Sequence, residues 1–363
     1  MVTRSSAAIV LIYHSYRDPL FQNLMLGYLR TLVKSQGVQF YLITFEQEHF
    51  ELSVKEVRRE KKILRQNGIL WYPIPYHTGR FIVASKIVDL FQAIFLIGKL
   101  RHLTKAKLLV TFTNLSASIG IICAQLFRLK MLVYCYEPHS DFLVELGIWR
   151  KGSFKHRISR LIEFYAGRRA DFVMASTKYV VDLLTDFKLR GRLVRAPVSV
   201  DEKAFTFKRK GRERVRKEYR LHNRNVVLYL GKFGYLYYNE EIAKLCKILY
   251  DNIDNTFFLI VTSNDNEVIQ KMFRKYGLPE ESFSVTGNLS YDEVKDYISA
   301  ADIGLSAVPP TPSQKFRSPT KVAEYLLCGL PYITCEGVSE DDIYAKKHNV
   351  GAVVKSFDEN HIS

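Results

Sequence analysis

Short apolar runs alternate with longer amphipathic segments along most of the chain, which predicts strands that alternate with helices. The expected strands of the first half are Ala8–Tyr13, Gln39–Phe45, Leu108–Thr113, Met131–Tyr136 and Phe172–Ala175. Those of the second half are Val226–Leu230, Thr256–Val261, Phe283–Val285 and Ile303–Ala307. The clearest helices are expected at Phe21–Ser35, Val83–Leu103, Asn266–Tyr276 and Tyr291–Ala300. Such alternation is typical of the α/β class, with parallel sheets covered by helices on both faces.

The 363 residues are enough for two α/β domains, each with its own core. We expect a first domain over residues 1–197, a basic linker and initial helix over 198–224, and a second domain over 225–363. The charged run Lys208–Arg220 is interpreted as a solvated helix. Its few aromatic residues show no arrangement for stacking on bases, so a nucleic-acid partner is not expected.

Targeting and redox signals point to a cytoplasmic protein without a membrane span. The five cysteines contain no C-x-x-C pair and are expected to be reduced, buried thiols that bind no metal. The N-terminal segment has the apolar pattern of a first strand and no cleavage site. Residues 108–127 lack charge, but polar residues divide them into a strand and a helix over Ala117–Phe127.

The most informative segment is Ser318–Pro331, which has the pattern of a helix that begins at an anion site. Ser318 is expected to cap this helix and Pro319 to occupy its first position, with Gly329 at its end. The free N–H groups of a helix start attract anions such as a diphosphate. Glu324, about one turn further on, is placed to accept hydrogen bonds from sugar hydroxyls. An ordinary capped helix with a solvated glutamate remains an open alternative.

A second phosphate signal follows the first strand of the second domain, where Gly231 and Gly234 would let the backbone approach a phosphate closely. Positive charge accompanies both signals and would stabilise a diphosphate leaving group. The candidate nucleotide-sugar-binding residues are therefore Gly231, Lys232, Gly234, Lys315, Ser318, Thr320, Lys321 and Glu324.

The first domain offers a candidate catalytic segment directly after the strand Met131–Tyr136. Residues past the carboxyl end of a parallel strand line the ligand crevice of an open sheet. Glu137 and Asp141 are candidate bases, and His139 is a candidate contact to a sugar hydroxyl or a phosphate oxygen. A proline-containing surface turn is the alternative. No D-x-D motif follows a strand, so no metal cofactor is expected.

Several of these segments together resemble a known family. The segment Ser318–Pro331 reads S-P-T-K-V-A-E-Y-L-L-C-G-L-P, and it resembles the nucleotide-sugar segment of retaining, GT-B-fold glycosyltransferases of family four, the "group 1" type. The resemblance is strongest to bacterial members of polysaccharide synthesis. It extends over residues 8–354 through the segments Asp18–Leu29, Leu42–Glu46, Trp71–His77, Gly147–Ser153, Leu228–Gly234 and Ala300–Leu305.

The resemblance implies two Rossmann-like domains that face a central cleft. It implies retaining transfer of a sugar from a nucleotide-diphospho-sugar to a glycan or lipid-linked acceptor. It also implies that Glu324 is the second acid of the family's E-x(seven)-E motif and holds the donor ribose. Phe316 stands in place of the first acid, and Lys315 beside it is a candidate substitute. The second domain is expected to lack the usual terminal helices. A non-catalytic protein that binds nucleotide-sugar or glycan is therefore the alternative.

Charge is distributed unevenly between the two halves. Residues 1–200 hold 30 Lys and Arg against 14 Asp and Glu, whereas residues 225–363 hold 13 against 19. A basic first domain predicts an anionic partner, for which we expect the inner face of the cytoplasmic membrane. The amphipathic segment Lys86–Leu103 is a candidate contact. A basic face that only aids solubility is the alternative.

Overall fold

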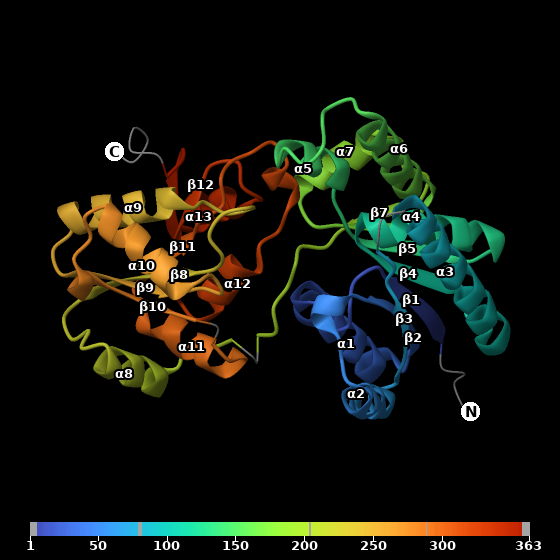
Figure 1. The fold of residues 1–363 in the computed structure, drawn as a ribbon, viewed down its shortest axis with the longest axis horizontal. Helices are drawn as coiled ribbons and strands as arrows, with labels where there is room; N and C mark the ends of the chain where they lie inside the picture. Colours follow the sequence, from blue (N-terminus) through green and yellow to red (C-terminus); the bar gives the residue numbers. More distant parts are fainter. Residues whose placement is uncertain (1–5, 79–81, 203–204, 288, 358–363) are drawn as a thin grey trace. The chain divides into compact units, whose positions relative to one another are not determined.

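The computed structural model describes residues 6–78, 82–202, 205–287 and 289–357. The chain divides into two compact units, residues 1–197 and residues 198–363. Each unit contains one parallel sheet with helices on its two faces (Figure 1). The predicted α/β class with two parallel sheets is therefore confirmed.

The first unit contains a seven-stranded sheet in the order β3-β2-β1-β4-β5-β6-β7. Its strands are β1 Ala7–Ile12, β2 Gln39–Glu46, β3 Ile69–Pro75, β4 Leu108–Phe112, β5 Lys130–Tyr136, β6 Phe172–Ala175 and β7 Arg192–Arg195. Its α-helices are α1 Leu26–Gln36, α2 Val54–Gln66, α3 Ile82–Thr104, α4 Thr113–Leu126, α5 His139–Glu145, α6 Phe154–Arg169 and α7 Lys178–Asp186. A π-helical turn, Phe21–Met25, precedes α1, and a 3-10 turn, Glu48–Phe50, follows β2.

The second unit contains a six-stranded sheet in the order β10-β9-β8-β11-β12-β13. Its strands are β8 Asn225–Leu230, β9 Thr256–Val261, β10 Phe283–Thr286, β11 Ile303–Ser306, β12 Tyr332–Cys335 and β13 Gly351–Val354. Its α-helices are α8 Arg209–Glu218, α9 Glu240–Asn252, α10 Asn266–Lys275, α11 Tyr291–Ala300, α12 Thr320–Leu327 and α13 Asp341–His348. Two 3-10 turns, Glu280–Ser282 and Gln314–Phe316, complete it.

Both sheets reverse their strand order next to their first strand. In the first sheet β1 lies between β2 and β4, and in the second β8 lies between β9 and β11. Because all pairings are parallel, the carboxyl ends of these central strands meet at one edge of each sheet. In open α/β sheets this reversal point is where ligands bind. The fold therefore provides one candidate ligand edge in each unit.

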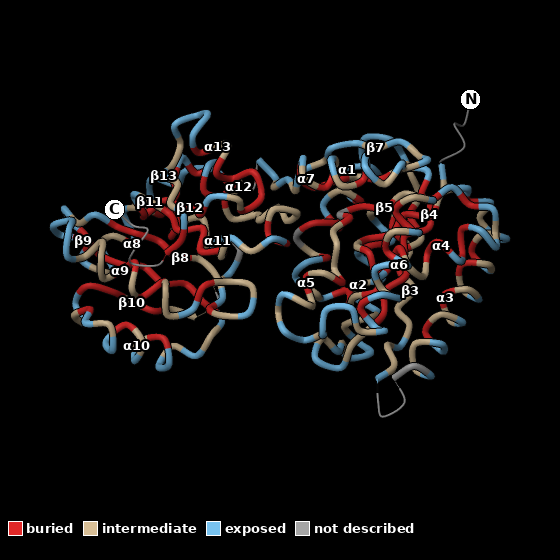
Figure 2. The backbone as a smooth tube through the Cα atoms, turned by 90° about the horizontal axis from the view of Figure 1, so that it is seen from above, coloured by how far each residue is buried: buried red, intermediate tan, exposed pale blue. Residues whose placement is uncertain are grey.

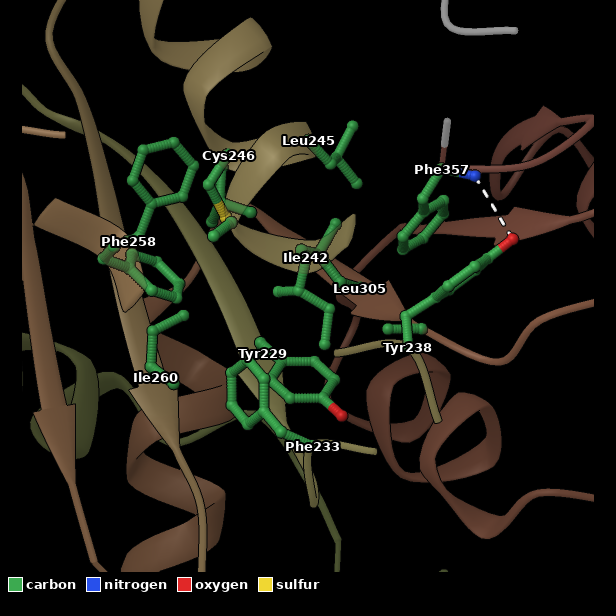
Figure 3. Packing of buried hydrophobic residues seen from close by; sticks show 14 of the residues in the cluster. Tyr229, Phe233, Tyr238, Ile242, Leu245, Cys246, Phe258, Ile260, Leu305 and Phe357 are labelled. Carbon is green, nitrogen blue, oxygen red and sulfur yellow. Dashed lines mark hydrogen bonds between the residues drawn. The ribbon is translucent and has the colours of Figure 1, made fainter. Parts of the chain in front are cut away.

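The central strands of each sheet are buried because helices cover both faces of the sheet (Figure 2). In the second unit the two faces have separate apolar cores. Figure 3 shows one of them, in which Phe258, Ile260 and Leu305 of the sheet pack under Ile242 and Cys246 of α9. The backbone N–H of Phe357 donates to the Tyr238 hydroxyl at 3.3 Å and joins the segment after β13 to this core.

The basic run after residue 208 is partly structural. The guanidinium group of Arg212 donates to the carbonyl oxygens of Ser299, Ala300 and Ala301 at 2.8–3.1 Å. Arg216 also donates to the Ala300 carbonyl oxygen, at 2.9 Å. These arginines cap the carboxyl end of α11, where the helix dipole favours positive charge. The prediction of a merely solvated helix over Lys208–Arg220 was therefore wrong for this pair.

Candidate functional site

The candidate site of the second unit lies at the carboxyl edge of its sheet, where the turn after β8 meets the start of α12. A Cβ atom placed on Gly231 would lie 3.1 Å from Cε of Lys321 and 2.9 Å from the Tyr229 hydroxyl. Only a residue without a side chain fits this close approach without displacing its neighbours. The structure thus brings together two segments that the sequence assigned separately to phosphate binding.

The two glycines of the turn shape its backbone, and their own amides are already paired. The N–H of Gly231 donates to the Val261 carbonyl oxygen at 2.9 Å, and that of Gly234 donates to the Tyr238 carbonyl oxygen at 3.1 Å. Gly234 has a φ of 76°, in the left-handed region that favours glycine. Between the two glycines, Lys232 is exposed, so positive charge near this turn comes from its side chain.

Gln314 fixes the loop before α12 and was not identified from the sequence. Its side-chain amide donates to the Leu236 carbonyl oxygen at 3.4 Å. Its main-chain carbonyl oxygen accepts from the Ser339 N–H at 3.1 Å. It therefore joins the loops that follow β8, β11 and β12. Lys315 and Phe316 come next, with the Lys315 ammonium 5.0 Å from the Phe316 ring centroid. The Gln314 side chain is only 4% exposed. This burial of a polar residue marks its structural role, and it cannot be read from the sequence.

The start of α12 differs from the prediction by one residue. Pro319 is the N-cap residue, Thr320 begins the helix, and no side chain makes a capping hydrogen bond. The Ser318 hydroxyl oxygen instead accepts from the Val198 N–H at 3.3 Å, so the prediction that Ser318 caps the helix was wrong. Because no side-chain oxygen caps this first turn, the helix start keeps the electrostatic character that favours an anion. The predicted end is correct, with Gly329 in the left-handed conformation at a φ of 74°.

Glu324 lies one turn into α12 and is half-buried. Burial raises the pKa of its carboxyl group above the usual range, whereas the Lys321 charge and a hydrogen bond with Thr320 oppose that rise. One polar group on α12 is therefore formed by Thr320, Lys321 and Glu324. Its Lys321 side chain lies next to Gly231. A carboxyl group and a lysine held together in this way suit a ligand with both hydroxyls and negative charge.

In the first unit, the predicted segment lies where expected, after the carboxyl end of β5. The Asn114 side chain fixes its first residue, since Nδ2 donates to the Glu137 carbonyl oxygen and Oδ1 accepts from the Glu137 N–H. Asn114 is buried in α4, directly after β4. The His139 N–H donates to the Glu137 carbonyl oxygen at 2.9 Å and begins α5. Glu137 and His139 are both half-exposed at this edge.

Two residues of α6 anchor the first turn of α5. Nε2 of His156 lies 2.9 Å from Oδ1 of Asp141. The buried Glu163 carboxyl group accepts from the Ser140 N–H at 3.0 Å and from the Ser140 hydroxyl at 2.7 Å. Asp141 therefore has a structural partner that the sequence did not reveal. His156 and Glu163 were also missed, because their role depends on contacts with a helix far away in the sequence.

Glu163 makes the stability of this anchor dependent on pH. Burial raises the pKa of its carboxyl group from 4.5 to about 7, against the lowering effect of the Ser140 hydrogen bonds. A raised pKa means that the folded state binds more protons than the unfolded state between pH 4.5 and about pH 7. This contribution to stability is full below pH 4.5 and is lost as the pH rises through about 7. The total change corresponds to about 3 kcal/mol.

We expect Glu163→Gln to remove this dependence, because glutamine keeps a hydrogen-bonding partner for each Ser140 group and does not ionise. The thermal midpoint of the variant relative to wild type should rise between pH 5 and pH 8 in melts at matched ionic strength. Glu145→Gln, at the other end of α5, removes the same charge from an exposed position and serves as the control. Parallel profiles for Glu163→Gln would contradict the assigned titration.

A second polar group lies after the carboxyl ends of β1 and β3. The Asp89 carboxylate is fully buried and accepts from the Tyr13 hydroxyl and from the Lys86 ammonium, the latter at 3.3 Å. Nδ1 of His77 lies 2.7 Å from the same carboxylate. The Lys86 ammonium also lies 3.5 Å from the Tyr76 ring centroid. This network balances the buried charge at the start of α3, and the sequence did not predict it.

Within residues 6–78, 82–202, 205–287 and 289–357, no three His, Cys, Asp or Glu side chains are grouped to hold a metal ion. None of the described helices combines the length and apolarity that crossing a membrane requires. Cys123, Cys246, Cys328 and Cys335 are all buried.

Comparison with known structures shows the fold of the whole chain. HepE from Anabaena, in complex with UDP, superposes with a TM-score of 0.69 at 11% identity, covering 97% of this chain and 86% of that one. Sucrose-phosphate synthase from Thermosynechococcus elongatus gives 0.70 at 16% identity, covering 98% and 87%. WaaG, a glycosyltransferase involved in lipopolysaccharide biosynthesis, gives 0.62 at 14% identity, covering 96% and 85%. Matching at this level of identity establishes the GT-B fold.

Sequence comparison matches the second unit to a known family. No curated protein matches the chain. The family model described as "Glycosyl transferases group 1" matches residues 211–363, which include the turn after β8, the Gln314 loop and all of α12. Over these residues the chain matches the group 1 glycosyltransferases, and it is a glycosyltransferase with the GT-B fold.

Proposed function

We propose that this glycosyltransferase moves a sugar from a nucleotide-diphospho-sugar to a hydroxyl group of a glycan or lipid-linked acceptor, with retention of the anomeric configuration. The donor would bind at the carboxyl edge of the second sheet. Lys321 and Lys315 would stabilise the charge that develops on the diphosphate, and Glu324 would hold hydroxyls of the ribose. In the first unit, His139 would contact the transferred sugar or the acceptor.

The single observation that carries this proposal is the approach of α12 to the glycine turn after β8, with Lys321 between Gly231 and Glu324. A diphosphate leaving group needs positive charge close to the oxygens that become anionic in the transition state. A ribose needs an acceptor for its hydroxyls, which the Glu324 carboxyl group offers. HepE, which is similar in fold, is known in complexes with UDP and with UDP-glucose, and this supports a nucleotide-sugar as the donor class.

Phe316 favours a second candidate function, in which the protein binds nucleotide-sugar or glycan without turnover. The family resemblance places an acid at this position, whereas the chain has an aromatic ring beside Lys315. We prefer the transferase because Thr320, Lys321 and Glu324 of α12 lie together as one polar group. Lys315 supplies a charge next to the missing acid.

A panel of nucleotide-diphospho-sugars tests the proposal. At least one donor should raise the thermal midpoint of the protein and should be hydrolysed slowly or transferred when glycan or lipid-linked acceptors are added. The anomeric configuration of the product, measured by NMR, should match that of the donor. Stabilisation without hydrolysis or transfer would favour the binding protein, and a panel without any stabilisation would contradict both.

We further propose that the transfer needs no metal, because lysines supply the charge beside the diphosphate. Activity measured with excess EDTA should equal activity without it. A requirement for added divalent cations would contradict this part of the proposal. The setting we propose is surface-polysaccharide assembly at the inner face of the cytoplasmic membrane, with a lipid-linked or growing glycan as acceptor.

A further inference from the structure

We propose that the outer surface of α3, α4 and α6 docks the first unit onto membranes that contain anionic lipid. The three helices form one layer, because α4 packs against both α3 and α6 (Figure 1). We name this surface the helical face. Docking here rests on the membrane setting proposed above, while the residues that carry it are separate from the donor site.

The helical face exposes an unusual number of large apolar side chains. On α3 and α6, Phe91 is 65% exposed, Phe95 74%, Phe154 80% and Leu161 62%. Scattered apolar residues are normal on a protein surface, but aromatic and aliphatic side chains gathered on adjoining helices mark an interaction site.

The central helix of the layer has an apolar outer stripe. Leu115, Ile122 and Leu126 of α4 are exposed at helical spacing, while the small residues Ala117 and Gly120 face inward. The inward residues are small because the sheet lies directly beneath, since a Cβ atom on Gly120 would come within 2.4 Å of Cγ2 of Thr111. Because the side of α4 with the small residues packs on the sheet, its larger aliphatic side chains point outward. Their exposure to water is unfavourable.

All exposed charges described on the three helices are positive. Their acidic residues are Asp89 and Glu163, and both are buried with hydrogen-bonding partners. Two of the basic residues are ion-paired within the unit, Lys86 with Asp89 and Arg160 with Asp141 of α5. The other exposed or half-exposed basic residues are Lys99, Arg101, Lys155, Arg157, Arg168 and Arg169. Apolar side chains surrounded by lysine and arginine are typical of helices that lie in the headgroup plane of an anionic bilayer.

Charge also distinguishes a lipid partner from a second copy of this chain. Two helical faces placed against each other would bring basic groups together with no exposed acid to balance them, which opposes association. An anionic bilayer offers counter-charges to these basic groups and accepts the apolar side chains between its headgroups. The surface therefore fits lipid better than it fits itself.

The proposal is tested by vesicle sedimentation of the full-length protein. Vesicles of phosphatidylcholine with about one-third phosphatidylglycerol should bind the protein at low salt, and binding should be weak at about 0.5 M salt. Pure phosphatidylcholine vesicles should bind poorly. The double variants Phe95→Ser with Phe154→Ser, and Lys155→Gln with Arg157→Gln, should each weaken binding about 10- to 30-fold.

Matched controls are available on α2, outside the helical face. Lys61→Gln with Lys62→Gln removes the same charge from exposed positions, and Val54→Ser removes an exposed apolar side chain. These variants should bind the anionic vesicles within about threefold of wild type, allowing for a weak general charge effect. Equal losses in the control and test variants would overturn the proposal, as would equal binding to neutral vesicles.

Two further measurements keep the test independent of folding and of the donor site. Thermal melts should show that all variants are folded, since every substituted residue is exposed. The midpoint shift caused by a nucleotide-sugar should be unchanged in the helical-face variants, so failure of docking and failure of the proposed donor site give different results. A wild-type dimer in sedimentation velocity that dissociates in Phe95→Ser with Phe154→Ser would show that the face binds a second copy, and would also overturn the proposal.

Discussion

Replacement of His139 with alanine is expected to lower kcat by about 10²- to 10⁴-fold, the usual contribution of a side chain that assists proton or charge movement in the transition state. The imidazole lies in the first turn of α5, at the carboxyl edge of the first sheet. Its main-chain position is fixed through Glu137 and Asn114 on one side and through Ser140 and Glu163 on the other. The substitution should therefore remove a side chain without moving the backbone that carries it.

Donor affinity should change much less than kcat in this variant, within about threefold, because Lys315, Lys321 and Glu324, the proposed contacts to the diphosphate and the ribose, belong to the second unit. An interaction made only in the transition state lowers kcat and kcat/KM together and leaves ground-state binding intact. Single-turnover kinetics and calorimetric titration of the donor measure the two quantities separately. His222→Ala, at an exposed position, is the control and should leave both unchanged.

The result can contradict the assignment in two ways. Equal losses in kcat and donor affinity would make His139 a ground-state contact. An unchanged kcat would support the alternative of a proline-containing surface turn. In that case Glu137, whose backbone is held by Asn114, would be the remaining candidate in this segment.

The strands of this fold were largely predictable because a strand buried on both faces gives a continuous apolar run. Phe172–Ala175 and Thr256–Val261 agree with the predicted bounds at both ends. β7 was missed, since Arg192–Arg195 is an edge strand whose arginines are exposed, and its sequence has no apolar run. β3 contains prolines at Pro73 and Pro75, which argue against a strand when only the sequence is known.

The helix α6 was not predicted, because its pattern is the reverse of an ordinary surface helix. His156 and Glu163 are buried, whereas Phe154 and Leu161 face outward. Prediction from hydrophobic periodicity assumes that apolar residues turn toward the core. It therefore fails on a helix that anchors the start of α5 through polar contacts and exposes its apolar side. The same reversal is what marks the helical face in the structure.

The candidate site of the second unit was predicted from local motifs, but its assembly could not be. The sequence alone predicts both the glycine turn and the start of the helix. That Gly231 lies next to Lys321 is seen only in the structure. Gln314 carries no local signal, because its hydrogen bonds reach loops that follow other strands. Sequence reasoning also assigned Ser318 to the helix cap from its residue type alone, while its hydroxyl is used by Val198. Contacts across the fold decided both cases.

Replacement of Glu324 with alanine is expected to weaken nucleotide-sugar binding by about one to two decades, with little loss of stability. A hydrogen bond between a carboxylate and a hydroxyl contributes about 1.5–3 kcal/mol, and each 1.4 kcal/mol is about tenfold in affinity. In the folded protein the half-buried Glu324 carboxyl group is hydrogen-bonded to Thr320. After truncation to alanine, a water molecule can take the place of the carboxyl group as the partner of Thr320. The fold should therefore survive the change.

Calorimetric titration with the donor found in the panel measures this effect directly. Glu324→Gln should lose less than Glu324→Ala, since the amide oxygen still accepts one hydrogen bond from a ribose hydroxyl although it carries no charge. Glu267→Ala removes an exposed glutamate from α10 of the same unit and controls for net charge. Because Lys321 lies beside Glu324, loss of the carboxylate also frees that lysine for the diphosphate, and this gain limits the net loss. An affinity for Glu324→Ala equal to that of Glu267→Ala would remove Glu324 from the donor site.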